Sequence, residues 1–258
     1  MTIALVTGAT AGIGAEFARQ LAARGHDLVL VARDGNRLES YADELRASHG
    51  VAVDVLVADL LDEAQFAIVE SRVGATLDPI DYLVNNAGFG LQKEFDENTI
   101  ADELRQFDVL ARVPLRLAHA ALGQMLPRHS GHIVTVSSTA GFGALGSYSA
   151  AKAWSLTFSR WANAYYRSNG VTVTAIAPGF VRTEFHERMG VSREAMAPSW
   201  MWLDVRPLVR RALLDVDRGV AVSVPSIRYK VIVALLRAAG PIVAMAVARR
   251  GAARRRRG

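Results

Sequence analysis

Residues 7–14 read TGATAGIG and directly follow an apolar, β-branched run, IALV at 3–6. Gly8, Gly12 and Gly14 remove side chains where a backbone must turn tightly, approach a pyrophosphate and let a helix pack on a strand. A helical pattern begins at once, so the helix N-terminus would face an anion. The stretch therefore predicts a dinucleotide-binding loop, with an ordinary tight strand-to-helix turn as the alternative.

Six further short apolar runs follow at intervals long enough for helices. This alternation predicts βαβ units and a parallel sheet covered on both faces. The chain has 258 residues, 51% of them hydrophobic, which is enough for the core of one such domain. We expect an α/β fold with a single doubly wound parallel sheet. Besides 3–6, the expected strands are 27–32, 52–58, 81–84, 132–137, 171–177 and 220–224.

The end of the second expected strand indicates which dinucleotide would bind. An acidic residue there would hydrogen-bond a ribose 2′-hydroxyl and repel a 2′-phosphate, but this chain has Ala32 followed by Arg33. A guanidinium can pair a phosphate in a bidentate manner. Arg33 therefore favours NADP(H) over NAD(H), unless it is only a solvated arginine that opens a helix.

Further motifs follow in a fixed order, and together they resemble the short-chain dehydrogenase/reductase family from Thr2 to about Thr183. Single short strings are weak evidence, but five in order at suitable spacing make a chance match improbable. Beyond the glycines, the motifs are Asp59 in VADL, NNAG at 85–88, Ser138 at a strand end, Tyr148 with Lys152 in a Tyr-x-x-x-Lys pattern, and PGFVRT at 178–183.

The resemblance implies a Rossmann-type fold and an NADP(H)-dependent oxidoreductase that interconverts a carbonyl and a secondary alcohol. It assigns catalysis to Ser138, Tyr148 and Lys152, and it assigns no metal. It also implies a homodimer or homotetramer built on the long helices. The cofactor-binding residues carried over by position are Gly8, Thr10, Gly12, Ile13, Gly14, Arg33, Asp59, Leu60, Asn86, Ala87, Gly88, Tyr148, Lys152, Pro178, Gly179, Val181 and Thr183.

Tyr148 and Lys152 lie four residues apart, which places both side chains on one helix face. A phenol has an ordinary pKa near 10, so a pKa near ~7 needs about 4 kcal/mol of preferential stabilisation of the tyrosinate. We expect Lys152 and the oxidised nicotinamide to supply it. In reduction, Tyr148 would donate a proton to the substrate oxygen while Ser138 hydrogen-bonds that oxygen.

Two features depart from the family pattern. Aligning residues 104–122 with the family's long helix puts Leu110 where an asparagine is usual, and the family uses that residue's main-chain carbonyl to hold a relay water near the lysine. We therefore expect an active but slow or specialised catalyst. The segment between Ser138 and Tyr148 is also short and rich in glycine, which indicates a small mobile wall of the substrate pocket or a neutral deletion.

Residues 184–205 correspond to the family's variable lid over the substrate. Their methionines and tryptophans, Met189, Met196, Trp200, Met201 and Trp202, offer an adaptable apolar surface. A lipophilic substrate would fit, and the resemblance suggests 3-oxoacyl groups, steroids or fatty carbonyl compounds of lipid metabolism. The equal alternative is that these side chains only pack the lid onto the body.

Charge divides the chain into a catalytic domain at 1–227 and an apolar, basic tail at 228–258. The tail holds nine Lys and Arg and no acid, so the net charge of +5 becomes −4 for residues 1–227. Arg237 and the Gly240-Pro241 pair argue against a membrane-spanning helix. The tail would bind anionic lipid peripherally or pack on a sister subunit. Specific nucleic-acid binding is not expected, because the arginine run lacks interleaved aromatic residues.

Other chemistries lack support in the sequence. The chain has no cysteine, which excludes disulfides and thiolate metal sites and is compatible with the cytoplasm. Its start reads as a strand and not as a signal peptide. The six histidines form no metal-binding pattern, and no Gly-x-Ser-x-Gly elbow occurs. The remaining alternative is a catalytically weak NADP(H)-binding regulatory or membrane-docking module.

Overall fold

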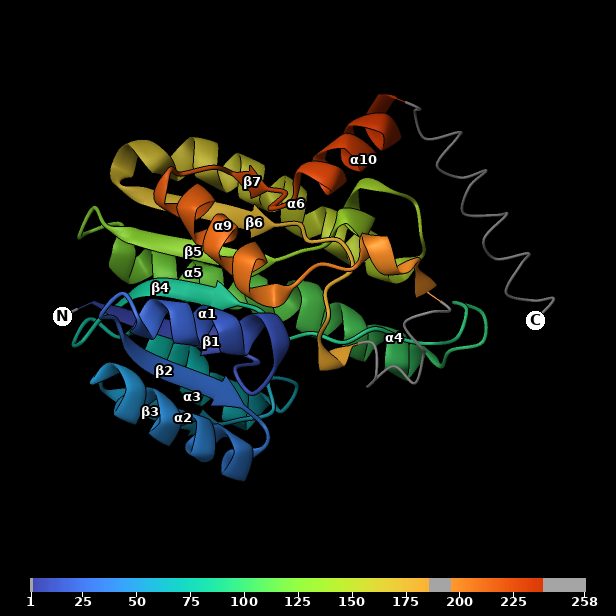
Figure 1. Cartoon of the computed structure of the whole chain (residues 1–258). Helices are drawn as coiled ribbons and strands as arrows, with labels where there is room; N and C mark the ends of the chain where they lie inside the picture. Colours follow the sequence, from blue (N-terminus) through green and yellow to red (C-terminus); the bar gives the residue numbers. More distant parts are fainter. Residues whose placement is uncertain (1, 186–195, 239–258) are drawn as a thin grey trace.

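A seven-stranded, fully parallel sheet forms the centre of the protein in a computed structural model, which describes residues 2–185 and 196–238 (Figure 1). All seven expected strands are present, and the doubly wound α/β fold is confirmed. The order across the sheet is β3-β2-β1-β4-β5-β6-β7. The strands are β1 (Ile3–Thr7), β2 (Asp27–Ala32), β3 (Val53–Val57), β4 (Ile80–Asn85), β5 (Gly131–Val136), β6 (Val171–Ile176) and β7 (Val222–Ser223).

Helices cover both faces of this sheet, and the central strands β1, β2, β4, β5 and β6 bury side chains on both sides. Along β1, Ala4 and Val6 belong to one buried cluster and Leu5 to the other. The first cluster is covered by α1 (Gly12–Ala22), α2 (Gly35–His49) and α9 (Val205–Asp217). The second is covered by α3 (Glu63–Gly74), α5 (Val113–Met125) and α6 (Ser147–Tyr166).

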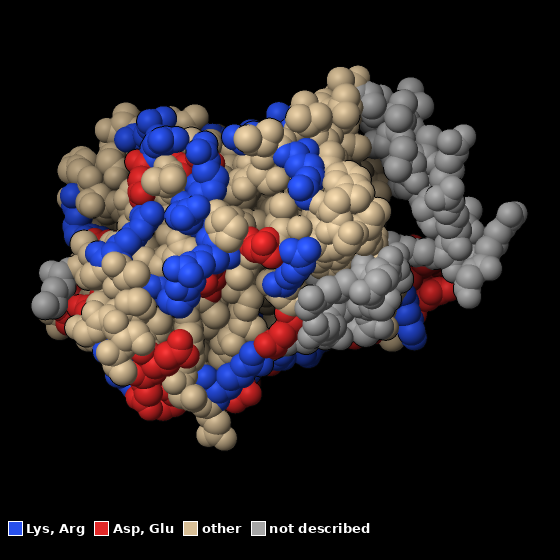
Figure 2. Space-filling model, in the orientation of Figure 1, with Lys and Arg blue, Asp and Glu red and all other residues tan. Residues whose placement is uncertain are grey.

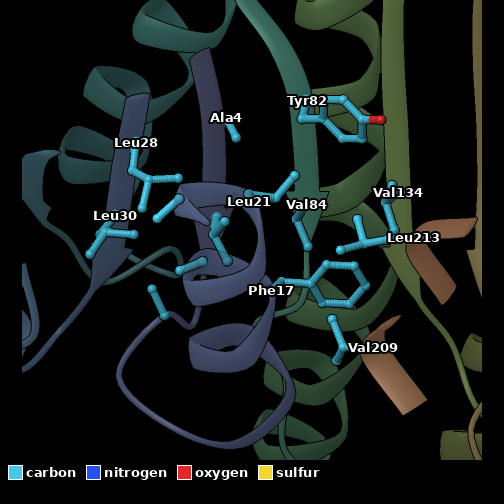
Figure 3. Close-up of a cluster of buried hydrophobic side chains, with 14 of the residues drawn as sticks. Ala4, Phe17, Leu21, Leu28, Leu30, Tyr82, Val84, Val134, Val209 and Leu213 are labelled. Carbon is cyan, nitrogen blue, oxygen red and sulfur yellow. The ribbon is translucent and has the colours of Figure 1, made fainter. Parts of the chain in front are cut away.

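The first cluster shows how α1 is held on the sheet (Figure 3). Phe17 and Leu21 project from one face of α1 and are fully buried. Their neighbours include Val84 of β4 and, across the helix pair, Val209 and Leu213 of α9. The helix that follows the glycine-rich loop is therefore fixed by packing as well as by its turn.

Shorter elements complete the chain. The helix α4 (Ile100–Phe107) continues through a π-helical turn, η1 (Asp108–Arg112), into α5. A 3₁₀ turn, η2 (Thr139–Phe142), precedes α6, another, η3 (Arg167–Asn169), follows it, and a third, η4 (Ser199–Met201), precedes α9. The helix α10 (Ile227–Ala238) closes the described chain and packs against η2. Residues 228–238 are thus attached to the body, whereas 239–258 lie outside the described residues.

The strand order reverses between β1 and β4, and this reversal positions the site. The segments that follow β1 and β4 turn to opposite faces of the sheet, so a crevice opens at the carboxyl ends of these two strands. The loop after β1 begins at Gly8 and the loop after β4 begins at Asn86. The two segments singled out in the sequence therefore meet at one edge.

Charged side chains are spread over the surface. Figure 2 shows basic and acidic groups mixed on one face, with Lys and Arg gathered over α1 and α9. Among the described residues, no helix combines the length and the apolar character needed to cross a bilayer.

Truncation of Phe17 tests the packing of α1. We expect Phe17→Ala to lower the free energy of unfolding by ~3–5 kcal/mol, because it opens a cavity among fully buried neighbours. Phe95→Ala removes the same atoms from a side chain that is 64% exposed, and it should change stability by less than about 0.5 kcal/mol. Denaturant titration measures both. Equal losses would contradict the assigned role of Phe17.

Candidate active site

Every candidate residue lies at the carboxyl edge of the sheet or on an element that begins there. Gly8 to Gly14 follow β1, Arg33 follows β2, and Asp59 and Leu60 follow β3. Asn86 to Gly88 follow β4 and Ser138 follows β5, while Pro178 to Thr183 follow β6. Tyr148 and Lys152 lie in the first turns of α6. The fold therefore gathers residues that are up to 175 positions apart.

The glycine-rich loop is tied to β4 by hydrogen bonds. Asn86 Nδ2 donates to the carbonyl oxygens of Thr7 and Gly8 at 2.9 and 3.1 Å. The Thr7 hydroxyl accepts the backbone N–H groups of Asn86 and Ala87 at 3.0 and 3.1 Å. A Cβ atom on Gly14 would lie 2.3 Å from Asn86 Nδ2 and 2.4 Å from the Gly8 oxygen. Only glycine fits at position 14.

The loop and the start of α1 fit a dinucleotide. Ala11, the residue before α1, provides no side-chain cap, and the first turn holds no acid. The N–H groups at that end therefore suit an external anion such as a pyrophosphate. Thr183 approaches from the segment after β6, since its Cγ2 atom lies 2.9 Å from a Cβ placed on Gly12. Thr10 and Ile13 complete the same loop, with Ile13 packed on the core.

The end of the edge that holds Arg33, Asp59 and Leu60 is less tightly connected. Arg33 is exposed, and no described residue forms an ion pair with it. Asp59 accepts a hydrogen bond from the Leu61 N–H at 3.0 Å, and Leu60 is buried. Among the described residues, no hydrogen bond or ion pair joins Arg33, Asp59 or Leu60 to Ser138, Tyr148 or Lys152.

Arg37 is a residue that the sequence analysis missed. It lies in the first turn of α2, and its guanidinium pairs with the carboxylate of Glu184 in a bidentate manner, with one contact at 3.0 Å. This ion pair links the start of α2 to the segment that leaves β6. Only charge in the sequence could have suggested it, because 147 positions separate the partners.

Tyr148 and Ser138 lie within hydrogen-bond reach of each other. Burial raises the pKa of Tyr148 to about 12, and the hydrogen bond with Ser138 opposes that shift. In the chain alone, the phenol thus moves away from the pKa near ~7 that the sequence led us to expect. The desolvation of the tyrosinate outweighs the effect of Ser138, so Tyr148 stays protonated at neutral pH. The Ser138 hydroxyl also accepts the Ala140 N–H at 3.1 Å.

Lys152 is buried beside Tyr148. Its Nζ atom lies 5.6 Å from the centre of the Tyr148 ring and donates to the Val136 carbonyl at 2.7 Å. Burial lowers the pKa of Lys152 to about 8. The hydroxyls of Ser137 and Ser155 both donate to the Lys152 carbonyl, at 2.8 and 2.7 Å. The lysine is therefore held by its backbone and its ammonium group together.

Leu110, which stands where the family usually has asparagine, lies in the π-helical turn η1 and is buried next to the site. It packs in an apolar cluster with Val109 and Ala151, against which Tyr148 also packs. Its Cδ2 atom lies 2.8 Å from a Cβ placed on Gly88. The leucine therefore fills space next to the NNAG segment.

The segment 178–183 is supported from the C-terminal helix. The Tyr229 ring of α10 lies on Gly179, where an added Cβ would come within 1.9 Å of it. The Tyr229 hydroxyl accepts the Phe180 N–H and donates to the Met201 carbonyl, each at 3.0 Å. Pro178 accepts the Thr139 N–H at 2.8 Å, and Val181 is bridged to Leu203. Sequence reasoning missed Tyr229, because the resemblance to the family ends at about Thr183.

The described part of the lid divides its two tryptophans. Trp202 is buried, packs on Phe180 and donates to the Ala197 carbonyl at 3.1 Å. Trp200 is 58% exposed. Trp202 thus follows the packing alternative, while Trp200 offers open apolar surface. Met189 lies outside the described residues, and Met196 and Met201 are partly buried. Within 2–185 and 196–238, no cluster of acidic or histidine side chains could hold a metal ion.

Comparison with known proteins places this edge in context. A family model described as short chain dehydrogenase matches residues 2–193. The 3-oxoacyl-acyl-carrier-protein reductase FabG of Aquifex aeolicus is 31% identical over 185 residues, which cover 70% of this chain and 75% of the relative.

Two solved structures are similar over most of the chain. A short-chain dehydrogenase from Sphingobium yanoikuyae in complex with NADPH is 35% identical, with a TM-score of 0.83 and coverage of 92% of this chain and 94% of the other. A bulky-bulky ketone specific alcohol dehydrogenase from Comamonas testosteroni is 34% identical, with a TM-score of 0.78 and coverage of 88% and 87%.

The buried ammonium of Lys152 predicts a specific pH dependence of stability. The folded pKa is about 8, against an ordinary value of 10.5. Its stabilising contribution is therefore complete above about pH 10.5 and is lost as the pH falls through about 8. The unfolding free energy of the wild type, minus that of Lys152→Met, should rise between these pH values by up to about 3 kcal/mol.

Urea titrations of the cofactor-free protein across this pH range measure the difference. Lys93→Met is the matched control, since Lys93 is exposed, and its difference from the wild type should stay flat. A flat curve for Lys152→Met as well would show that the ammonium is not buried.

Proposed function

The chain belongs to the short-chain dehydrogenase family, and on that premise we propose that it interconverts lipophilic ketones and secondary alcohols with Tyr148 as the general acid and base. Members of this family are oxidoreductases that act on carbonyl and alcohol groups with a nicotinamide cofactor, here NADP(H). The observation that carries the proposal is the position of the buried Lys152, whose Nζ atom lies 5.6 Å from the centre of the Tyr148 ring.

The cofactor would supply or accept the hydride, and the chain would handle the proton. A phenol that stays protonated at neutral pH can donate its proton to a carbonyl oxygen as negative charge develops there. Ser138 would hydrogen-bond the same oxygen. Lys152 would stabilise the tyrosinate that remains, because an opposite charge close by favours the ionised form. For oxidation the roles reverse, with Tyr148 as the base.

Several residues would hold NADP(H). Gly8, Gly12 and Gly14 would let the pyrophosphate approach the first turn of α1. Arg33 would pair with the 2′-phosphate, since it is exposed and no described carboxylate neutralises it. The proposal assigns the adenine end to Asp59 and Leu60. It assigns the rest of the cofactor to Thr10, Ile13, Asn86, Ala87, Gly88, Pro178, Gly179, Val181 and Thr183.

The lipophilic substrate class rests on three observations. Trp200 leaves aromatic surface exposed on the lid. The similar proteins include one named for bulky ketones and one named for 3-oxoacyl groups. Leu110 adds an apolar side chain next to Tyr148. We therefore place long-chain 3-oxoacyl, steroid or related carbonyl compounds first among candidate substrates.

We further propose a homodimer or homotetramer that uses the outer face of α6. Its aromatic rings form a chain from Trp154 through Phe158 to Trp161 and Tyr165, with centroid distances of 5.2, 5.8 and 5.9 Å. Trp161 and Tyr165 are 54% and 65% exposed. Exposed aromatic patches of this kind mark interaction surfaces. Residues 228–258 would add either a subunit contact or a peripheral membrane contact.

Replacement of the tyrosine hydroxyl tests the mechanism. Tyr148→Phe should lower the rate of NADPH oxidation by ~10²–10⁴-fold, because the general acid is lost while the ring remains. The assay offers lipophilic ketones, aldehydes and 3-oxoacyl thioesters. Tyr165→Phe, on the same helix and exposed, should keep full activity. Turnover that survives in Tyr148→Phe would refute the assignment, and NADPH binding without Tyr148-dependent turnover would favour a regulatory binding module.

Replacement of Arg33 tests cofactor recognition separately. Arg33→Ala should weaken NADPH binding by ~10–100-fold, because one charge-assisted interaction with the 2′-phosphate is lost. NADH lacks that phosphate, so its dissociation constant should stay the same. Fluorescence titration of both reduced cofactors gives the two constants. An equal loss for NADH would mean that Arg33 supports the fold and not the 2′-phosphate.

A further inference from the structure

A second recess lies at the opposite end of the sheet from Arg33. It is an open cavity of about 470 Å³ between η2, α6, β7 and α10. Three cations line it, Arg160 from α6 and Lys230 and Arg237 from α10. The remaining wall is apolar and includes Phe142, Val222 and Val224.

The three cations face no carboxylate in the part of the chain that the structure describes. Among the described residues, none of them takes part in an ion pair. The sequence explains why, since residues 109–183 and 218–258 contain no Asp or Glu and every lining element lies in those segments. The nearest acids by sequence are Asp217, which pairs with Arg24 and accepts the Tyr82 hydroxyl at 2.8 Å, and Asp215 of α9, which accepts the Ser223 hydroxyl at 2.7 Å. Ser223 alternates with Val222 and Val224, so it points to the other face of β7.

Two of the cations, Arg160 and Arg237, repel each other. The Phe142 ring has the Arg237 guanidinium carbon 4.7 Å from its centre and the Arg160 carbon at 5.8 Å. Burial lowers the pKa of Arg160, and the charge of Arg237 lowers it further. The aromatic ring offsets only part of this repulsion. An anion held between the guanidinium groups would convert it into attraction.

The size and lining of the cavity limit the kind of anion. Pockets for small organic molecules begin at roughly 300 Å³, so a bare phosphate would leave most of the volume unfilled. The valines and Phe142 would face an apolar part of the ligand. On α10, Lys230, Ala234 and Arg237 form the face that lines the cavity, while Ile227, Val231 and Leu235 form the adjacent face. Those three side chains are 83%, 56% and 64% exposed.

We propose that this cavity binds the phosphate group of an ester, with the phosphate between Arg160, Lys230 and Arg237 and the organic part against Phe142 and the valines. The phosphate could belong to a soluble ester or to a lipid headgroup, and the exposed apolar face of α10 would suit the latter. The cavity is separate from the cofactor edge. One of its lining residues, Phe142, ends the turn η2, and that turn begins directly after Ser138.

Phosphate-dependent stability tests the site. Sodium phosphate should raise the melting temperature of the wild type above that in sodium chloride of equal ionic strength and pH. The double variant Arg160→Gln/Arg237→Gln should lose this rise, with an affinity for phosphate at least about tenfold weaker. In chloride it should be as stable as the wild type or more so, because a like-charge repulsion is removed. This second readout shows that the variant is folded.

Arg210→Gln is the matched control, since Arg210 is exposed on α9, outside the cavity, and no described residue forms an ion pair with it. It should keep the full effect of phosphate. Phosphate bound at the cofactor edge would stabilise the double variant as much as the wild type. The proposal is therefore overturned if the rise is undiminished in the double variant and vesicle binding does not require Arg160 and Arg237 either.

Vesicle sedimentation separates the two sources of the phosphate. Phosphatidylcholine vesicles with and without phosphatidic acid are mixed with each protein. Binding that requires phosphatidic acid and is lost in the double variant alone identifies a lipid headgroup. A phosphate effect on stability without such binding identifies a soluble ester. If neither readout depends on Arg160 and Arg237, the cavity is not a phosphate site.

Discussion

The close approach of β1 and β4 is the constraint on which the remaining structure depends. At their carboxyl ends the Asn86 amide donates to the carbonyl oxygens of Thr7 and Gly8, which end β1 and begin the next loop. Gly14 has no room for even one methyl group. The contact sets the entry of α1, and the packing of Phe17 then fixes its direction. The tight spacing at the ends of these two strands therefore shapes the edge that suits a dinucleotide, and the loops that follow the strands fit that spacing.

Burial is the largest cause of the pKa shifts of the two candidate catalytic residues on α6. Burial raises the pKa of Tyr148 to about 12 and lowers that of Lys152 to about 8. Both shifts favour the neutral form of the side chain. The protein alone thus builds a site that disfavours charge. A positively charged cofactor would change that balance, because an opposite charge nearby favours the tyrosinate. The site is therefore suited to carry charge only when it is loaded.

Local patterns predicted the fold and most of the edge. All seven strands followed from short β-branched runs, because such runs in a parallel sheet are buried on both faces. The glycines and NNAG fell at the ends of β1 and β4, and the Tyr-x-x-x-Lys pattern fell in the first turns of α6. Contacts between distant segments were not predictable, as with Arg37 and Glu184 or Tyr229 and Gly179. The direction of the Tyr148 shift also depended on burial, which spacing alone does not report.

The attachment of Tyr229 to the segment 178–183 affects when the site can form during synthesis. Chains emerge from the ribosome N-terminus first, and a domain folds as its parts become available. The glycine-rich loop, Ser138 and Tyr148 all emerge before residue 180, yet the ring that supports Gly179 and the hydroxyl that holds Phe180 come some fifty residues later. The nascent protein would therefore hold an almost complete sheet whose binding edge is finished among the last folding events.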